Sequence, residues 1–107
     1  MAYTQVEIGN KGEKLVGAFL KQKGYSTNID TKAPGSTDIE ARGSKSSLLV
    51  QVKSAVKPNE PVSISSDEER NIKSRAAKLG WEAWEARVQL DASLNQVGEI
   101  KWRKLTS

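Results

Sequence analysis

The chain has 107 residues, and its 17 lysines and arginines outnumber its 13 aspartates and glutamates, which gives a formal net charge of +4. It contains no cysteine and no histidine, which excludes disulfides, thiolate or imidazole metal ligands, and catalysis by Ser-His or Cys-His pairs. Acid–base or metal chemistry therefore falls to aspartate, glutamate, lysine, tyrosine, glutamine and backbone oxygens, and oxygen ligands favour Mg²⁺ or Mn²⁺. The modest positive charge favours a polyanionic partner.

The length suits one compact domain over residues 1–107. No apolar run is long enough to cross a bilayer, and no stretch has the pattern of a signal peptide. We therefore expect a cytoplasmic protein without a membrane partner.

A first helix is predicted over residues 4–23, because lysines in the last turn and Gly24 just beyond it are common at helix ends. The three-and-four spacing of a helix predicts an inward stripe of Val6, Gly9, Glu13, Val16, Gly17 and Leu20. Glu13 is a carboxylate in this apolar stripe, where burial without a cation would be costly. Glu13 therefore either lies at the rim, paired with a lysine, or reaches a metal ion near the sheet.

Three strands are predicted next, and the second and third bring polar side chains together. Residues 25–29 form an edge strand, followed by a loop at residues 30–36. The glycine- and serine-containing stretch at residues 42–46 predicts a hairpin, so the strands that carry Asp38 and Gln51 should be antiparallel neighbours. Side chains two apart on a strand share a face, which puts Gln51 and Lys53 together, opposite the apolar Leu48, Val50 and Val52.

A second helix is predicted to begin with a capping box formed by Ser66 and Glu69 and to end near Leu79, before Gly80. Its buried stripe should consist of Ile72, Ala76 and Leu79. Residues 82–90 and 97–105 alternate as two further strands, with Trp84 and Trp102 packed in the core. The expected order is helix, three strands, helix, two strands.

An acid on the first helix, an aspartate at the start of one strand and Gln-x-Lys on the next resemble the PD-(D/E)xK nuclease superfamily. Residues 12–16, followed by Gly24 and Tyr25, are similar to the opening helix of archaeal Holliday-junction resolvases. Lys53 and Ser54 match the end of their motif, and the resemblance spans roughly residues 9–54.

The chain departs from the superfamily pattern at two positions. Thr37 stands where the proline that gives the motif its name would be, and Gln51 replaces the usual acid. The Gln-x-Lys form is similar to Mrr-type restriction enzymes and to the endonuclease subunit of certain heteromeric transposases. Those proteins carry further domains, for which we expect no room in this chain.

The resemblance implies an α/β fold with a restriction-endonuclease-like core, in which a mixed five-stranded sheet is flanked by two helices in the order αβββαββ. It implies a DNA endonuclease that depends on Mg²⁺ or Mn²⁺ and uses the catalytic residues Glu13, Asp38, Gln51 and Lys53. Glu13, Asp38, the amide oxygen of Gln51 and the backbone carbonyl of Val52 would hold the metal. Glu40 would either supply the missing carboxylate or pair with Arg42. Replacing Gln51 by glutamate should preserve activity and tighten metal binding.

Backbone phosphates of DNA would be held by basic residues spread along the chain, namely Lys45, Lys57, Arg70 and Lys73. By analogy with the junction resolvases we expect a homodimer that selects branched DNA, from a prokaryote, a virus or a mobile element. Two alternatives stay open: a sequence-specific or modification-dependent nuclease of restriction or mobile-element type, and a non-catalytic nucleic-acid-binding domain of the same fold.

Overall fold

The computed structural model describes residues 3–30 and 38–106, apart from the side chains of Asp30 and Asp38. Thr37 and most of the predicted loop at residues 30–36 lie outside this description. The elements, in chain order, are α1 (Gln5–Gln22), β1 (Ser26–Asp30), β2 (Asp38–Arg42), β3 (Ser47–Val56), α2 (Ser66–Leu79), β4 (Glu82–Leu90) and β5 (Gln96–Lys104). This order confirms the one predicted from the sequence.

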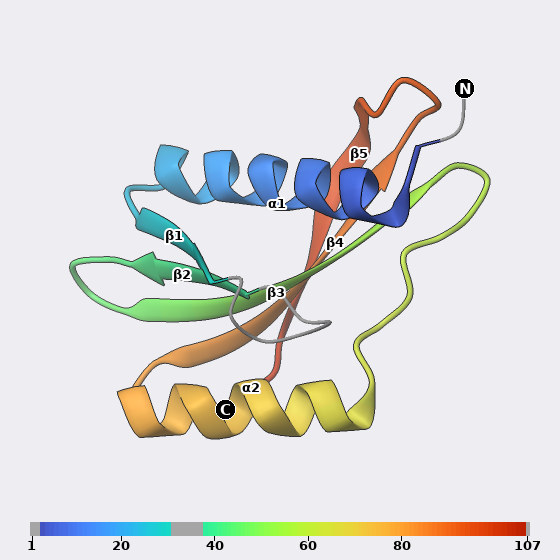
Figure 1. The fold of residues 1–107 in the computed structure, drawn as a ribbon. Helices are drawn as coiled ribbons and strands as arrows, with labels where there is room; N and C mark the ends of the chain where they lie inside the picture. The colour runs from blue at the N-terminus through green and yellow to red at the C-terminus, as the bar shows by residue number, and fades with distance from the viewer. Residues whose placement is uncertain (1–2, 31–37, 107) are drawn as a thin grey trace.

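The strands form one five-stranded sheet in the order β1-β2-β3-β4-β5, with β1 at one edge as predicted. Neighbouring strands are antiparallel except for β3 and β4, which are parallel and connected through α2. Figure 1 shows a twisted sheet with α1 across one face and α2 across the other. The mixed sheet between two helices is therefore confirmed.

The α1-side cluster fills the space between α1 and the sheet and contains Ile8, Val16, Leu20, Ile39, Ala41, Leu48, Val50, Ala86, Val88 and Leu90. The predicted stripe on α1 is wrong at Val6, which is 71% exposed, while Ile8 is buried. The buried residues follow the four-residue spacing from Ile8 through Gly12 to Val16. Val6 lies about 200° around the helix from Ile8 and so faces away from the sheet.

The α2-side cluster is smaller and contains Leu49, Ile64, Ile72, Ala76, Ala83 and Leu105. Ile72 and Ala76 are buried as predicted, but Leu79 is 53% exposed. Trp81, which follows the end of the helix, packs against the cluster instead.

The capping box of α2 begins one residue earlier than predicted. The N-cap is Ser65, whose side chain accepts a hydrogen bond from the backbone of Glu68, while the Glu68 side chain accepts one from the backbone of Ser65. Ser66 and Glu69 have the same spacing, so the sequence pattern alone does not separate the two pairs. The start at Ser65 frees Glu69 for a contact described below.

Tryptophans pack where β4 meets β5 and α1, as predicted. The ring centroids of Trp84 and Trp102 are 6.3 Å apart in an edge-to-face arrangement, and the ring centroids of Phe19 and Trp102 are 5.5 Å apart. The Arg42 guanidinium lies 5.4 Å from the centre of the Trp81 ring.

Within residues 3–30 and 38–106, neither helix is both long and apolar enough to span a membrane.

Gly12 allows α1 to approach β3 closely, and replacing it with alanine should destabilise the protein. An added methyl group would overlap the Ser54 hydroxyl and lie 3.0 Å from Ser54 Cβ. We expect Gly12→Ala to lower the free energy of unfolding in urea by about 1–2 kcal/mol. Gly9→Ala is the matched control, because its methyl group meets nothing within 4 Å and should stabilise the helix by about 0.5–1 kcal/mol. Equal effects of the two variants would contradict this account.

Candidate active site

A row of polar residues crosses the sheet at the level of Gln51. The strand pairing places Asp30, Asp38, Gln51, Glu85 and Arg103 side by side, one from each strand. The described pairing of β2 with β3 ends at Asp38 and Gln51, whereas β3 continues beside β4 as far as Val56. The predicted neighbours Asp38 and Gln51 are therefore paired directly across two strands.

Gln51 and Lys53 both point toward α2, and both bind Glu68 there. Gln51 is 2% exposed, and its Nε2 donates a hydrogen bond of 2.8 Å to Glu68 Oε2. Lys53 Nζ donates to the same oxygen, also at 2.8 Å. Because the amide nitrogen of Gln51 faces Glu68, its Oε1 is the end that can act as a neutral oxygen ligand.

Glu68 is ionised at neutral pH in this arrangement. Partial burial raises the pKa of its carboxyl group, but the hydrogen bonds from Lys53 and from the Ser65 backbone outweigh burial, and the net pKa is lowered from its ordinary value of 4.5. The result is a carboxylate, an ammonium group and an amide in one cluster.

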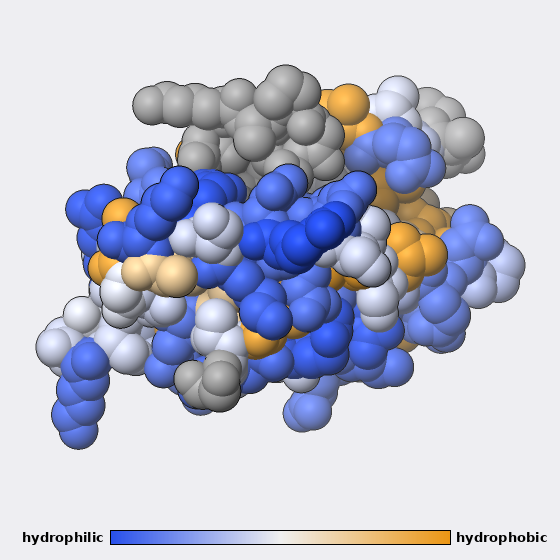
Figure 2. Space-filling view, turned by 90° about the horizontal axis from the view of Figure 1, so that it is seen from below, coloured by the Kyte–Doolittle hydropathy of each residue, from blue (hydrophilic) through white to orange (hydrophobic). Residues whose placement is uncertain are grey.

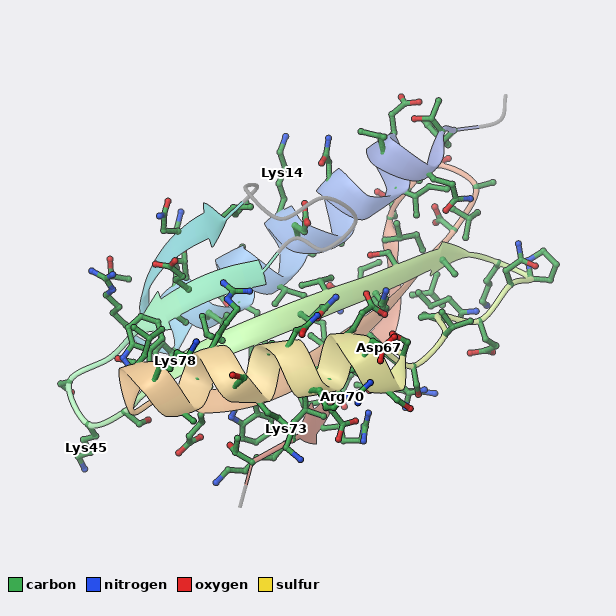
Figure 3. The ribbon with its side chains drawn as sticks, turned by 60° about the horizontal axis from the view of Figure 1, so that its bottom comes forward. Lys14, Lys45, Asp67, Arg70, Lys73 and Lys78 are labelled. Carbon is green, nitrogen blue, oxygen red and sulfur yellow. The ribbon has the colours of Figure 1, made fainter. Side chains whose placement is uncertain are left out.

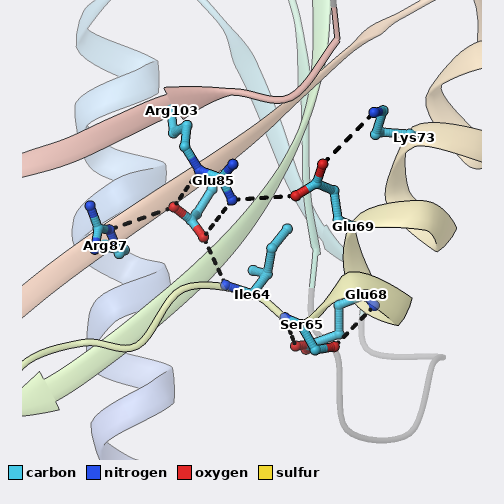
Figure 4. Close-up of polar contacts among 8 residues, drawn as sticks. All are labelled: Ile64, Ser65, Glu68, Glu69, Lys73, Glu85, Arg87 and Arg103. Atoms are coloured by element: carbon cyan, nitrogen blue, oxygen red, sulfur yellow. Dashed lines mark hydrogen bonds and ion pairs between the residues drawn. The ribbon is translucent and has the colours of Figure 1, made fainter.

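Glu85, the neighbour of Gln51 on β4, is a fully buried carboxylate (Figure 4). Its Oε1 lies 3.2 Å from Arg103 Nε and 3.5 Å from Arg87 Nε. Its Oε2 accepts a hydrogen bond of 2.8 Å from the backbone nitrogen of Ile64. Arg103 Nη2 also lies 3.4 Å from Glu69 Oε1, and this ion pair connects β5 to the first turn of α2.

Glu13 approaches the sheet from the other side. It is 8% exposed and belongs to α1, which covers the face opposite α2. Its neighbour Gly12 packs on Ser54, so Glu13 lies near the part of β3 that follows Lys53. Whether its carboxylate and that of Asp38 share one cation stays a prediction, because the Asp38 side chain lies outside the description.

The backbone register sets residue 38, an aspartate, opposite Gln51, and Val52 directly follows Gln51 on β3. Carboxylate, amide and backbone carbonyl oxygens are the types of ligand that suit a hard cation. Among the residues that the structure describes, no group of three acidic side chains forms a metal site by itself. Glu40 Oε1 lies 3.5 Å from Arg42 Nη2, which matches the predicted pairing of Glu40 with Arg42.

No protein-family model matches the chain, and no curated protein matches it in sequence. Among solved structures, it is similar to Hjc, a Holliday junction resolvase from the archaeal hyperthermophile Archaeoglobus fulgidus. The sequences are 21% identical, the TM-score is 0.72, and the match covers 91% of this chain and 72% of Hjc. This similarity establishes the fold that the resemblance implied.

The four predicted phosphate-binding residues do not form one patch. Lys45 lies in the hairpin between β2 and β3, and Lys57 directly follows the opposite end of β3; Figure 3 shows Lys45 apart from Arg70 and Lys73 on α2. Arg70 pairs with Asp67 within the helix, and Lys73 lies 3.7 Å from Glu69.

A row of basic residues runs parallel to the polar row described above. Lys53, Arg87 and Lys101 are neighbours on β3, β4 and β5. Arg87 and Lys101 also line a hollow of about 200 Å³, together with Lys57. The surface on the α2 side is largely hydrophilic (Figure 2). Glu60 and Glu99 line the same hollow, so its lining carries charges of both signs.

Sequence reasoning missed Glu68 and Glu85 as parts of this region. An acid near a helix N-terminus is ordinarily explained by the helix dipole, and the sequence around Glu85 does not indicate which residue is its partner. The overlap of two Ser-x-x-Glu patterns at residues 65–69 was the available signal that two acids at the helix start have different partners.

Removing the charge of Glu85 should destabilise the protein in a pH-dependent way. We expect Glu85→Gln to lower the free energy of unfolding at pH 7 by about 2 kcal/mol, since it loses the charge-assisted hydrogen bonds from Arg103 and the ion pair with Arg87. Burial raises the pKa of Glu85, but the bonds from Arg103 and Ile64 lower it below the ordinary 4.5. The stabilisation is therefore complete above pH 4.5 and is lost as the pH falls through the lowered pKa.

Urea unfolding of wild type, Glu85→Gln and the exposed control Glu99→Gln between pH 3 and 7 measures this effect. The gap between wild type and Glu85→Gln should close at the acid end, while Glu99→Gln follows wild type throughout. A gap that does not depend on pH would contradict the assignment.

Proposed function

We propose that this protein is a metal-dependent DNA endonuclease that hydrolyses phosphodiester bonds and selects branched DNA. The observation that carries the proposal is the strand register, which sets Asp38 opposite Gln51 with Lys53 two residues further along β3. The similarity of the fold to a Holliday junction resolvase supports the same conclusion.

Mg²⁺ or Mn²⁺ would be held by Asp38, Gln51 Oε1 and the Val52 carbonyl, with Glu13 as a further ligand. A bound metal would polarise the scissile phosphate and lower the pKa of the attacking water. Lys53, two residues after Gln51 on β3, would neutralise charge that develops on the phosphate or orient the water. Because the amide of Gln51 carries no charge, a metal held there would be a stronger Lewis acid than one held by a carboxylate at the same position.

We infer selection by DNA shape from the kind of contact that the described basic residues offer. Cations such as Lys45, Lys57, Arg87 and Lys101 would contact backbone phosphates, which fixes position without reading sequence. A four-way junction presents phosphates in an arrangement that linear duplex lacks. A surface that recognises only phosphates can discriminate between the two.

The proposal includes a homodimer. Resolving a four-way junction requires cuts in two strands, and each chain offers one Asp38–Gln51–Lys53 site. Two copies related by a two-fold axis would supply both cuts. Sedimentation with and without junction DNA measures the stoichiometry.

The decisive experiment compares cleavage of a four-way junction with that of a matched linear duplex, in Mg²⁺, in Mn²⁺ and in chelator. We expect wild type to cut the junction in either metal and not in chelator. Asp38→Ala and Lys53→Ala should abolish cutting, because one removes a metal ligand and the other the ammonium group at the phosphate. Both variants should retain their fold and most of their DNA affinity.

Equal cutting by wild type and both variants would refute the assigned site. Preference for one linear sequence over the junction would instead indicate a nuclease of restriction or mobile-element type. Metal-independent binding without cleavage would indicate a non-catalytic nucleic-acid-binding domain.

The basic residues should contribute unequally to DNA binding. Each of Lys45→Ala and Lys57→Ala should reduce the slope of log affinity against log salt by about 1, as expected for the loss of one phosphate contact. Arg70→Ala should change the slope less, because Asp67 already pairs with this guanidinium. Lys21→Ala, on α1 across the sheet, is the control. If Lys21→Ala reduced the salt slope more than Lys57→Ala, DNA would bind on the α1 side of the sheet, and the assignment of these contacts would be wrong.

A further inference from the structure

Glu68 belongs both to the start of α2 and to the candidate active site. Its Oε1 accepts a hydrogen bond of 2.9 Å from the backbone nitrogen of Ser65, which closes the capping box. Its Oε2 accepts bonds of 2.8 Å from both Gln51 and Lys53. The two oxygens of this carboxylate therefore have different partners: Oε1 binds the backbone at the helix cap, and Oε2 binds two side chains of β3.

We propose that Glu68 is a positioning residue of the nuclease site, holding the Lys53 ammonium in place and turning the Gln51 amide so that Oε1 serves as the ligand. In this arrangement α2 supplies the negative charge that β3 lacks because residue 51 is a glutamine. The inference rests on the proposed function, because it concerns the same site.

Capping alone does not account for these contacts. The capping box of α1 uses Thr4 and Glu7 with the same spacing and the same reciprocal bonds. Glu7 is exposed, and the bonds described for it stay within that box. Glu68 closes an equivalent box with one oxygen and directs the other to two side chains of β3, 15 and 17 residues away in the chain.

The amide at residue 51 and the carboxylate at residue 68 are complementary. A glutamate at position 51 would bring a second carboxylate to within hydrogen-bond distance of Glu68 Oε2, where two ionised groups repel each other. Gln51→Glu alone should therefore be unfavourable, which revises the expectation from the sequence. Exchanging the two groups should restore one carboxylate and one amide at the same place.

The test uses Glu68→Gln, Gln51→Glu and the exchanged variant Gln51→Glu/Glu68→Gln. Glu68→Gln should slow single-turnover cleavage of a four-way junction in Mg²⁺ by about tenfold or more, with the dissociation constant for DNA in chelator unchanged within about twofold. The exchanged variant should recover cleavage to within about threefold of wild type, because coupled substitutions at contacting residues are not additive.

Two controls separate positioning from helix stability. Glu7→Gln makes the same change in the other capping box and should cut like wild type. Ser65→Ala weakens the α2 cap without altering the charge at residue 68 and should also cut like wild type. A loss of cleavage in Ser65→Ala equal to that in Glu68→Gln would reduce Glu68 to a capping role and overturn the proposal.

Urea unfolding in metal-free buffer gives a readout that does not depend on activity. At pH 7 Gln51→Glu should lower the unfolding midpoint, and adding Glu68→Gln should restore it. The penalty in the single variant should shrink as the pH falls and one carboxylate of the pair is protonated. Independent effects of the two substitutions would overturn the pairing.

The outcomes distinguish this proposal from the proposed function. If Glu68→Gln cuts at the wild-type rate while Lys53→Ala does not cut, the positioning role is wrong and the nuclease assignment stands. If wild type cuts no DNA while residues 51 and 68 remain coupled in stability, the proposed function fails and the catalytic part of this inference fails with it.

Discussion

The alternation of side chains along β3 is the constraint on which both the core and the candidate site depend. Leu48 and Val50 belong to the α1-side cluster, while Leu49 belongs to the cluster under α2. Gln51 and Lys53 continue the α2 face. A shift of one residue in the pairing of β3 would drive both polar side chains under α1 and turn apolar ones toward the charged cluster. Pairing with β2 on one side and β4 on the other makes such a shift expensive.

The buried carboxylate of Glu85 connects that register to the position of α2. Burying a charge is unfavourable unless it is paired and hydrogen-bonded, and Glu85 finds its partners on β5 and in the segment that leads into α2. The contact of Arg103 with Glu69 holds the first turn of the helix at the same place. With the start of α2 fixed in this way, Glu68 lies directly over the two side chains of β3. The strand register and the helix position thus support each other.

The order of the elements and the antiparallel pairing of β2 with β3 were predictable because their signals are local: alternation, helical periodicity and turn residues. The N-cap was not, since Ser65–Glu68 and Ser66–Glu69 fit the same pattern, and contacts with Lys53 and Arg103 separate them only in the folded protein. Burial of Glu85 likewise depends on an arginine that reaches it only once β4 and β5 have paired. The convergence of Glu13 and Asp38 on one cation stays a prediction from the sequence.

The shared use of Glu68 by the helix cap and by β3 has a consequence for partial unfolding. Helix ends fray more readily than helix centres, and such local opening requires less free energy than global unfolding. When the first turn of α2 opens, the side chain that holds Lys53 and Gln51 leaves with it, although the sheet stays intact. Such opening would therefore separate Glu68 from Lys53 and Gln51 while Trp84 and Trp102 stay packed between β4 and β5.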